Sequence, residues 1–232
     1  MAEAGTMESS SIGGMETTAV GTVETSPVIE VAIRLLDLIG ASLLLILFAP
    51  LLLAVALVVR LDSKGPAIFR QRRFGRGMEQ FSVAKFRTMH EGCPADAHRA
   101  HVEKMLDTGG QESQPMVKLE KDPRVTRVGS FLRRTSIDEL PQLWNVVRGE
   151  MSLVGPRPPL QYEVDKYPAE AFRRFAVRPG LTGLWQVRGR STLTFRQMIE
   201  LDTEYVERRS LPLNLKILLL TPLAVVHGEG AA

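Results

Sequence analysis

The sequence has only one cysteine, Cys93, so the chain cannot form an intrachain disulfide. This absence suits a protein whose main body faces a reducing cytosol. Cys93 lies near His90, His98 and His101, but no CxxC motif or repeated ligand spacing accompanies it. A metal site at this cysteine therefore has little support.

Several nucleotide-binding and hydrolase motifs are also missing. Gly75-Arg76-Gly77 lacks the third glycine of a dinucleotide fingerprint, and there is no GxxxxGK(S/T) phosphate loop. No GxSxG elbow is present, which argues against a serine hydrolase. Aromatic residues make up only 6% of the chain and no reader motif is visible, so we expect no nucleic-acid partner.

Positive charge is absent from residues 1–33, which contain five acids and no lysine or arginine. Residues 60–90 contain eight basic residues against Asp62 and Glu79. Such asymmetry indicates an anionic partner for the basic segment: lipid head groups, nucleotides or nucleic acid. Because the RQRRFGR stretch abuts an apolar segment, contact with anionic membrane lipid is the simplest interpretation.

A long run without charge indicates a membrane element. Residues 38–59 read LIGASLLLILFAPLLLAVALVV, 22 consecutive uncharged residues. About twenty apolar residues span the hydrocarbon core of a bilayer as a helix. Pro50 lies near the middle of the run and predicts a kink. Hydropathy favours a straight span, whereas the proline leaves open a helix–break–helix hairpin that returns both ends to the cytosolic side.

These patterns divide the chain into three parts. Residues 1–27 are rich in Gly, Ser, Thr and Glu, and we predict a disordered leader there. They do not form a signal peptide, because the apolar run comes too late and has no basic start. Residues 28–60 are the predicted membrane anchor. Residues 61–227 are the predicted soluble domain, long enough to bury a core of its own.

Within the soluble part, the sequence predicts both strands and helices. FSVAKFRTM (residues 81–89) alternates in polarity as a half-buried strand does. Residues 95–107 are typical of a helix, and residues 108–116 of a surface loop. Leu211–Val226 is strongly apolar with Lys216 as its one charge, which predicts a segment that lies in the membrane interface or packs on the body.

The clearest predicted soluble helix is Thr135–Arg148. Ser136 and Glu139 have capping-box spacing, and Pro141 is early enough to be tolerated in the first turn. Apolar residues recur on one face at helical spacing. This predicted face consists of Ile137, Leu140, Leu143, Trp144 and Val147.

Two adjacent acids, Asp138 and Glu139, lie in the first turn of that predicted helix. A purely structural role is open, because acids at a helix N-terminus favour the macrodipole and complete caps. Neighbouring side chains on a helix diverge by about 100°. One carboxylate could therefore attack a substrate while the other holds a metal ion or the substrate.

Cationic residues precede and follow these acids. Lys85 lies in the predicted strand, Arg133 directly before the predicted helix, and Arg157 between two prolines after it. Guanidinium groups fork onto phosphate oxygens, and rigid turns can aim them. An acid can approach a diphosphate only if the negative charges of the diphosphate are neutralised by arginine and by a divalent cation.

Three sequence blocks carry a resemblance to a known family. They are KFRTM (85–89), DPRVTRVGSFLRRTSIDELPQLWNVVRGEMSLVGPRP (122–158) and RPGLTGLWQVRGR (178–190). These blocks resemble the bacterial sugar transferases, the monotopic polyprenyl-phosphate phosphoglycosyltransferases. Members of that family begin capsule, exopolysaccharide or glycoprotein glycan assembly.

The resemblance implies an α-rich α+β fold with a membrane-embedded re-entrant helix, a cytosolic catalytic domain and interfacial amphipathic helices. Its implied location is the cytosolic face of the bacterial inner membrane. Family members often break the re-entrant helix at Ser-Pro, whereas this chain has Ala49-Pro50 and so lacks the serine. A serine hydroxyl can satisfy a carbonyl freed at the break, so this departure weakens the hairpin interpretation slightly. We expect the catalytic module with its anchor, without the extra N-terminal spans of larger members.

The resemblance also implies a reaction and its residues. Asp138 attacks the β-phosphate of a UDP-sugar, releases UMP and becomes a phosphosugar ester, which undecaprenyl phosphate then attacks. Glu139, with Asp138, positions Mg²⁺ and the reacting groups. Lys85, Arg133 and Arg157 hold phosphates. Neither the sugar nor the oligomeric state follows from the sequence.

Two rival functions remain open at this stage. One is a non-catalytic membrane-anchored scaffold that binds anionic lipid or a glycan-assembly partner. The other is direct glycosyl transfer, which releases UDP where phosphoglycosyl transfer releases UMP.

Overall fold

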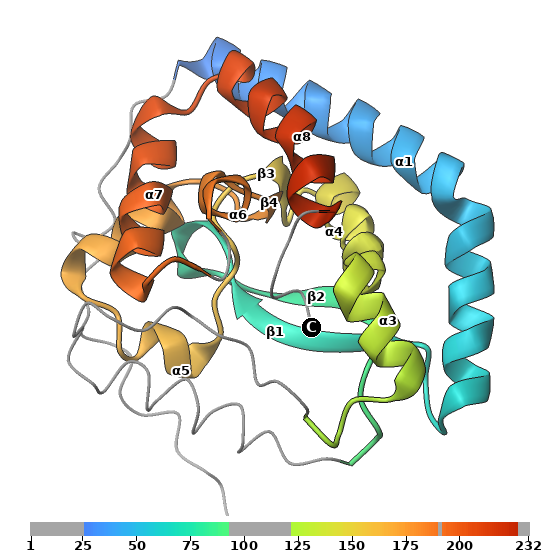
Figure 1. Ribbon diagram of the computed structural model, residues 1–232. Helices are drawn as coiled ribbons and strands as arrows, with labels where there is room; N and C mark the ends of the chain where they lie inside the picture. The colour runs from blue at the N-terminus through green and yellow to red at the C-terminus, as the bar shows by residue number, and fades with distance from the viewer. Residues whose placement is uncertain (1–25, 93–121, 190–191, 227–232) are drawn as a thin grey trace, which may run out of the picture.

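The computed structural model describes residues 26–92, 122–189 and 192–226. Its longest element is α1 (Pro27–Asp62), which runs across one side of the molecule and then turns down an adjacent side (Figure 1). Among the described residues, α1 is the one helix that is long and apolar enough to cross a membrane. The predicted long apolar element is therefore confirmed.

The helix α1 continues through Pro50 without interruption. Proline removes the hydrogen bond that its N–H would donate to the carbonyl of Ile46, while the turns on either side keep theirs. Figure 1 shows the resulting change of direction part-way along the helix. The predicted break at Pro50 is thus a bend within one continuous helix.

Strands β1 (Ile68–Phe74) and β2 (Gln80–Phe86) form an antiparallel hairpin, closed by the 3-10 turn η2 (Arg76–Met78). The register places Phe69 opposite Lys85, and directly opposed residues share a face of the sheet. The strand predicted within residues 81–89 is confirmed as β2. The sequence did not predict β1, because its arginines obscure the alternation.

The second sheet consists of two short parallel strands, β3 (Ser152–Val154) and β4 (Gly180–Thr182). The chain beyond β3 stays close to β4, since Gly155 N–H donates to Thr182 at 2.8 Å. A Cβ at Gly155 would lie 2.5 Å from the carbonyl oxygen of Arg178. A side chain does not fit at residue 155 without separating the two strands.

Helices make up most of the remaining structure and enclose the main core, which confirms the α-rich class. Apolar residues of α1, α4, β3, α7 and α8 meet in that core. The helices are α3 (Arg127–Thr135), η3 (Ile137–Gln142), α4 (Leu143–Arg148), α5 (Gln161–Val164), η4 (Ala169–Ala176), α6 (Leu184–Arg188), α7 (Phe195–Arg208) and α8 (Leu211–Val226).

The single helix predicted for 135–148 is wrong. Helix α3 ends at Thr135, Ser136 adopts a left-handed conformation with φ 56°, and the 3-10 turn η3 precedes the short α4. The Ser136 side chain caps nothing, so the predicted capping box is absent. Pro141 lacks an N–H and disfavours α geometry in the residue before it, which accounts for the 3-10 turn.

The predicted apolar face is confirmed apart from Trp144. Trp144 is 54% exposed, whereas Leu143 and Val146 are fully buried in the main core. Leu140 and Val147 pack against the main core, and Ile137 packs against a second cluster of Val59, Phe86 and Leu132, so four of the five predicted residues meet apolar neighbours.

Helix α8 confirms that Leu211–Val226 is one structured segment. It packs against α1, α6 and β3 with Asn214 and Ile217 buried, and leaves Leu219 and Leu223 exposed. The prediction that this segment packs on the body is thus confirmed. The leader up to residue 25, the helix predicted at 95–107 and the loop predicted at 108–116 lie outside the described residues.

Candidate active site

Asp138 lies on the turn that separates α3 from α4. The left-handed Ser136 ends α3, and η3 then packs against β2. Asp138 is 9% exposed, and the adjacent Glu139 is half-buried. The turn therefore presents two carboxylates of different accessibility beside a strand that carries a lysine.

That lysine is Lys85 on β2. Its Nζ lies 5.4 Å from the centre of the Phe69 ring, on the face shared with Arg73. Burial, followed by the charges of Arg73 and Arg157, lowers the pKa of Lys85 to about 8, while Asp138 and Glu139 act to raise it. Lys85 thus lies within electrostatic range of both acids and both arginines.

Arg133 approaches the nucleophile candidate from the last turn of α3. Its Nε donates to the Thr88 hydroxyl at 3.0 Å, which holds the side chain against the end of β2. Burial lowers the pKa of Arg133, and the nearby carboxylates of Asp138 and Asp122 oppose that effect. A cation from α3 and a cation from β2 therefore both act on Asp138.

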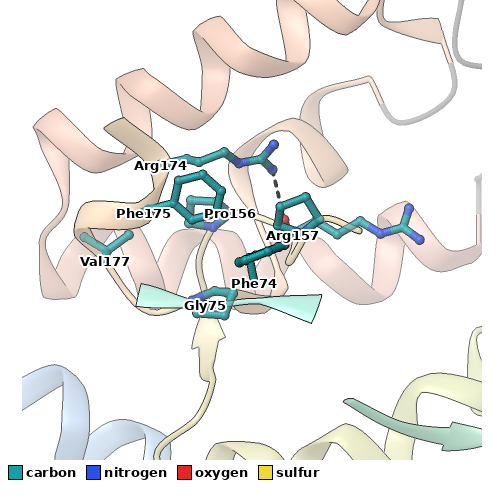
Figure 2. Close-up of a pocket in the computed structure, with 9 residues that line it drawn as sticks. Phe74, Gly75, Pro156, Arg157, Arg174, Phe175 and Val177 are labelled. Carbon is teal, nitrogen blue, oxygen red and sulfur yellow. Dashed lines mark hydrogen bonds between the residues drawn. The ribbon is translucent and has the colours of Figure 1, made fainter. Parts of the chain in front are cut away.

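Arg157 occupies the turn after β3, where the sequence reads PRPP (residues 156–159, here the PRPP turn). Its side chain is exposed and, in Figure 2, extends away from Arg174, whose guanidinium reaches its backbone carbonyl. The turn borders a small hollow between Phe74 and Phe175. This hollow is far too small to hold a nucleotide sugar.

Arg73 belongs to this group although the sequence did not single it out. It is 8% exposed, and its Nη1 donates to the Pro158 carbonyl at 2.5 Å. Burial and the charge of Arg157 lower the pKa of Arg73 to about 10, while Glu163 and Glu139 act to raise it. The stretch RQRR (residues 70–73) contains the buried Arg73 and the exposed Arg70 and Arg72. Only the pairing of β1 with β2 identifies Arg73 as the arginine on the same face as Lys85.

Asn145 is a second residue whose function the sequence did not reveal. It is 3% exposed; its Oδ1 accepts from the Ala84 N–H at 3.1 Å, and its Nδ2 donates to the Ser82 carbonyl at 2.8 Å. The amide thus pairs with the edge of β2 as another strand would. Through this contact, the element that follows Asp138 is fixed to the strand that carries Lys85.

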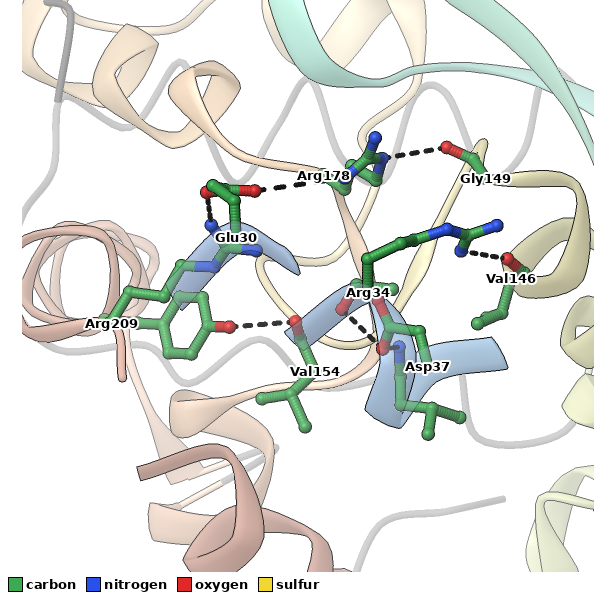
Figure 3. Close-up of polar contacts among 11 residues, drawn as sticks. Glu30, Arg34, Asp37, Val146, Gly149, Val154, Arg178 and Arg209 are labelled. Carbon is green, nitrogen blue, oxygen red and sulfur yellow. Dashed lines mark hydrogen bonds and ion pairs between the residues drawn. The ribbon is translucent and has the colours of Figure 1, made fainter. Parts of the chain in front are cut away.

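Polar side chains near the start of α1 fasten this helix to the same body (Figure 3). Arg34 donates to the carbonyls of Val146 and Val147 at 2.7 and 2.8 Å, at the C-terminal end of α4. Asp37 Oδ1 accepts from Leu153 N–H at 2.8 Å. Glu30 pairs with Arg209.

The far end of α1 is fastened as well. Arg87, directly after β2, donates to the carbonyls of Val59 and Ser63 at 3.1 and 2.7 Å and also to that of Lys64. Both ends of the apolar helix are therefore bound to one folded body.

The acids suit a magnesium ion that is shared with a substrate. In the described part of the chain, no group of three or more His, Cys, Asp or Glu side chains could hold a metal by itself. Mg²⁺ usually takes one or two carboxylates together with substrate phosphates. Asp138 and Glu139 fit that donor set.

Comparison with known proteins places the chain in a family. The family described as Bacterial sugar transferase matches residues 28–228. The chain belongs to the bacterial sugar transferase family.

Three relatives illustrate the range of similarity. A UDP-glucose:undecaprenyl-phosphate glucose-1-phosphate transferase of Caulobacter vibrioides is 46% identical over 85% of this chain and 71% of its own length. The exopolysaccharide production protein ExoY of Rhizobium meliloti is 40% identical over 87% of this chain and 88% of its own. The galactosyl transferase CpsE of Streptococcus agalactiae serotype III is 43% identical over 87% of this chain, which spans only 43% of the length of CpsE.

The structure thus brings the five predicted site residues of this sugar transferase into one region. Asp138 and Glu139 lie on η3, Lys85 on β2, Arg133 on α3 and Arg157 on the PRPP turn. Their individual roles stay predictions.

Proposed function

We propose that this chain transfers a sugar 1-phosphate from a UDP-sugar to undecaprenyl phosphate, as the first membrane step of exopolysaccharide or capsule assembly. The family membership and the names of its relatives support this reaction. The observation that carries it is the arrangement at Asp138: a nearly buried carboxylate on which Lys85 and Arg133 both act.

The proposed reaction has two displacements. A carboxylate oxygen of Asp138 attacks the β-phosphorus of the donor, the bond to the bridging oxygen breaks, and UMP leaves. A phosphate oxygen of undecaprenyl phosphate then attacks the same phosphorus and releases the Asp138 carboxylate. Covalent catalysis of this kind divides one difficult displacement into two easier ones.

The cations give this carboxylate access to an anionic substrate. Two negative groups repel each other unless nearby positive groups neutralise them, and fixed cations do so without reorganisation during the reaction. Lys85, Arg133 and Arg157 are the proposed phosphate-binding residues. Glu139, with Asp138, would hold Mg²⁺, which supplies further neutralisation of the diphosphate when it is bound.

We also propose that α1 is re-entrant. Its first turns are bound to α4 and β3 through Arg34 and Asp37, and its last turns to the segment after β2 through Arg87. A helix whose two ends contact one folded body cannot place those ends on opposite sides of a bilayer. Residues 28–60 would thus anchor the catalytic domain, 61–227, to the cytosolic face of the bacterial inner membrane.

The exposed surface of α1 suits burial in lipid. Its outward side chains include Leu43, Leu47, Leu53 and Leu57, and α8 adds Leu219 beside them. An apolar surface of this extent on a monomer marks a membrane or protein contact. The acceptor lipid would then meet the water-soluble donor where this surface ends.

The test is nucleotide release by the full chain with undecaprenyl phosphate, Mg²⁺ and a panel of UDP-sugars. We expect UMP, and we expect Asp138→Asn to abolish both UMP release and covalent labelling by the phosphosugar. Asp165→Asn is the matched control, because Asp165 is exposed and its carboxylate accepts a hydrogen bond from the exposed Gln161. Release of UDP would instead indicate direct glycosyl transfer, and lipid binding without nucleotide release would indicate a scaffold.

A further inference from the structure

The PRPP turn is unusual in its hydrogen-bonding requirements. Three of its four residues are prolines, so the turn has four carbonyl acceptors and only one N–H donor. A buried carbonyl without a donor costs free energy comparable to a lost hydrogen bond. The turn must therefore obtain its donors from other parts of the chain.

All four carbonyls receive such a donor. The two outer ones accept from the backbone: Pro156 from Gly180 N–H at 2.8 Å and Pro159 from Phe74 N–H at 3.1 Å. The two central ones accept from arginine side chains: Arg157 from Arg174 Nη2 at 2.9 Å and Pro158 from Arg73 Nη1 at 2.5 Å. Two guanidinium groups thus hold the backbone that directly follows the Arg157 Cα, and the Gly180 N–H holds the carbonyl that precedes it.

Arg174 is itself held on several sides. Its Nη2 lies 2.8 Å from Asp202 of α7, its Nη1 donates to the Tyr167 hydroxyl at 2.5 Å, and its guanidinium lies 5.3 Å from the centre of the Tyr167 ring. Arg174 is only 4% exposed. Its guanidinium is therefore in the protein interior, where it contacts the back of the turn.

We propose that Arg174, oriented by Asp202 and Tyr167, is a positioning residue for the donor diphosphate. It acts by fixing the backbone from which the Arg157 side chain extends. The inference rests on the proposed function only in taking Arg157 to bind phosphate. Lysine does not replace arginine here. The planar guanidinium of arginine reaches the Arg157 carbonyl, the Tyr167 hydroxyl and the Asp202 carboxylate together, and a single ammonium group cannot.

The experiment measures the dissociation constant for UDP by isothermal titration calorimetry with the full chain in nanodiscs and Mg²⁺ present. We compare wild type, Arg157→Ala, Arg174→Lys and the double variant. Because each change removes or misplaces a charge-assisted contact to phosphate, each single variant is expected to bind UDP on the order of tenfold more weakly. The double variant is expected to bind no more weakly than Arg157→Ala alone, since Arg174 acts through Arg157.

Arg173→Lys is the matched control. Arg173 precedes Arg174 in the chain but is exposed and pairs with Glu207 on the surface, so UDP affinity should stay within about twofold of wild type. Tyr167→Phe provides a milder variant that keeps the ring and removes only the hydroxyl acceptor, in case Arg174→Lys does not fold. It should weaken UDP binding in wild type and have no effect in Arg157→Ala.

The inference is overturned if the losses of the single variants multiply in the double variant, if Arg174→Lys and Tyr167→Phe both bind UDP like wild type, or if wild type does not bind UDP. UMP release by the same preparations tests the proposed function separately. A chain that binds UDP with the expected coupling but releases no UMP would retain the inference and lose the proposed reaction.

Discussion

Removal of the Asn145 side chain should destabilise the protein and slow its reaction, because Asn145 joins the strand of Lys85 to the helix that follows Asp138. Asn145→Ala leaves the N–H of Ala84 and the carbonyl of Ser82 without their partner. Both groups lie against a residue that is almost completely buried, so water does not readily replace the lost amide.

The magnitude follows from these two orphaned groups. Each buried backbone group left unsatisfied costs about 1–3 kcal/mol, so the variant should lose roughly 2–6 kcal/mol of unfolding free energy. For a chain of this size about 1 kcal/mol corresponds to roughly 2–4 °C in Tm, which predicts a fall of at least about 4 °C. A looser fit between α4 and β2 should also lower the rate of UMP release.

Thermal unfolding of the detergent-solubilised protein, followed by circular dichroism, measures this effect. Gln161→Ala is the matched control, because it also removes an amide but from an exposed position, where the expected change is below about 0.5 kcal/mol. A Tm of Asn145→Ala within about 2 °C of wild type would refute the reasoning, since the edge of β2 would then need no partner.

Three further predictions concern the site and its surroundings. Burial lowers the pKa of Lys85 to about 8, so the donor half-reaction of wild type should slow as pH rises above about 8 and the lysine loses its charge. Arginine stays charged at that pH, so Lys85→Arg should keep its rate to higher pH. An identical alkaline decline in wild type and Lys85→Arg would contradict this prediction. Gly155→Ala should lower the Tm, because its new Cβ would lie 2.5 Å from the Arg178 carbonyl oxygen. Gly77→Ala meets no neighbouring atom and carries only the cost of its left-handed φ of 65°, about 1–2 kcal/mol, so it should lower the Tm less. The opposite order in circular dichroism would show that the close approach at residue 155 is unimportant. Chelation by EDTA should stop UMP release, and added Mg²⁺ should restore it. The Tm should change little on chelation, because the described residues contain no cluster that holds a metal alone. A large fall in Tm would point to a structural metal instead.

Much of the local structure followed from residue patterns. The apolar run at 38–59 predicted a long membrane-type helix, and the alternation at 81–89 predicted the strand β2. The helix prediction for 135–148 failed because spacing alone does not show that Ser136 turns left-handed or that the next residues form a 3-10 turn. Local patterns succeed where burial repeats over several turns and fail where one residue redirects the backbone.

The site shows the same division. Lys85, Arg133 and Arg157 could be nominated because they lie in blocks typical of the family. Arg73 and Arg174 could not, because each looks in sequence like one of many arginines. Their distinguishing property is a hydrogen bond to a carbonyl on a segment far along the chain.

The sequence by itself determined the membrane-type helix, the adjacent acids and the supply of cations, since these depend on residue type and short-range spacing. Only the tertiary structure decided that both ends of α1 are bound to one body, that Arg157 is exposed, and that Arg73 and Arg174 support the turn behind it. The physical reason is that donors and acceptors in this protein find their partners across distances of tens of residues. A guanidinium group acquires its function from the carbonyl or carboxylate that folding places beside it.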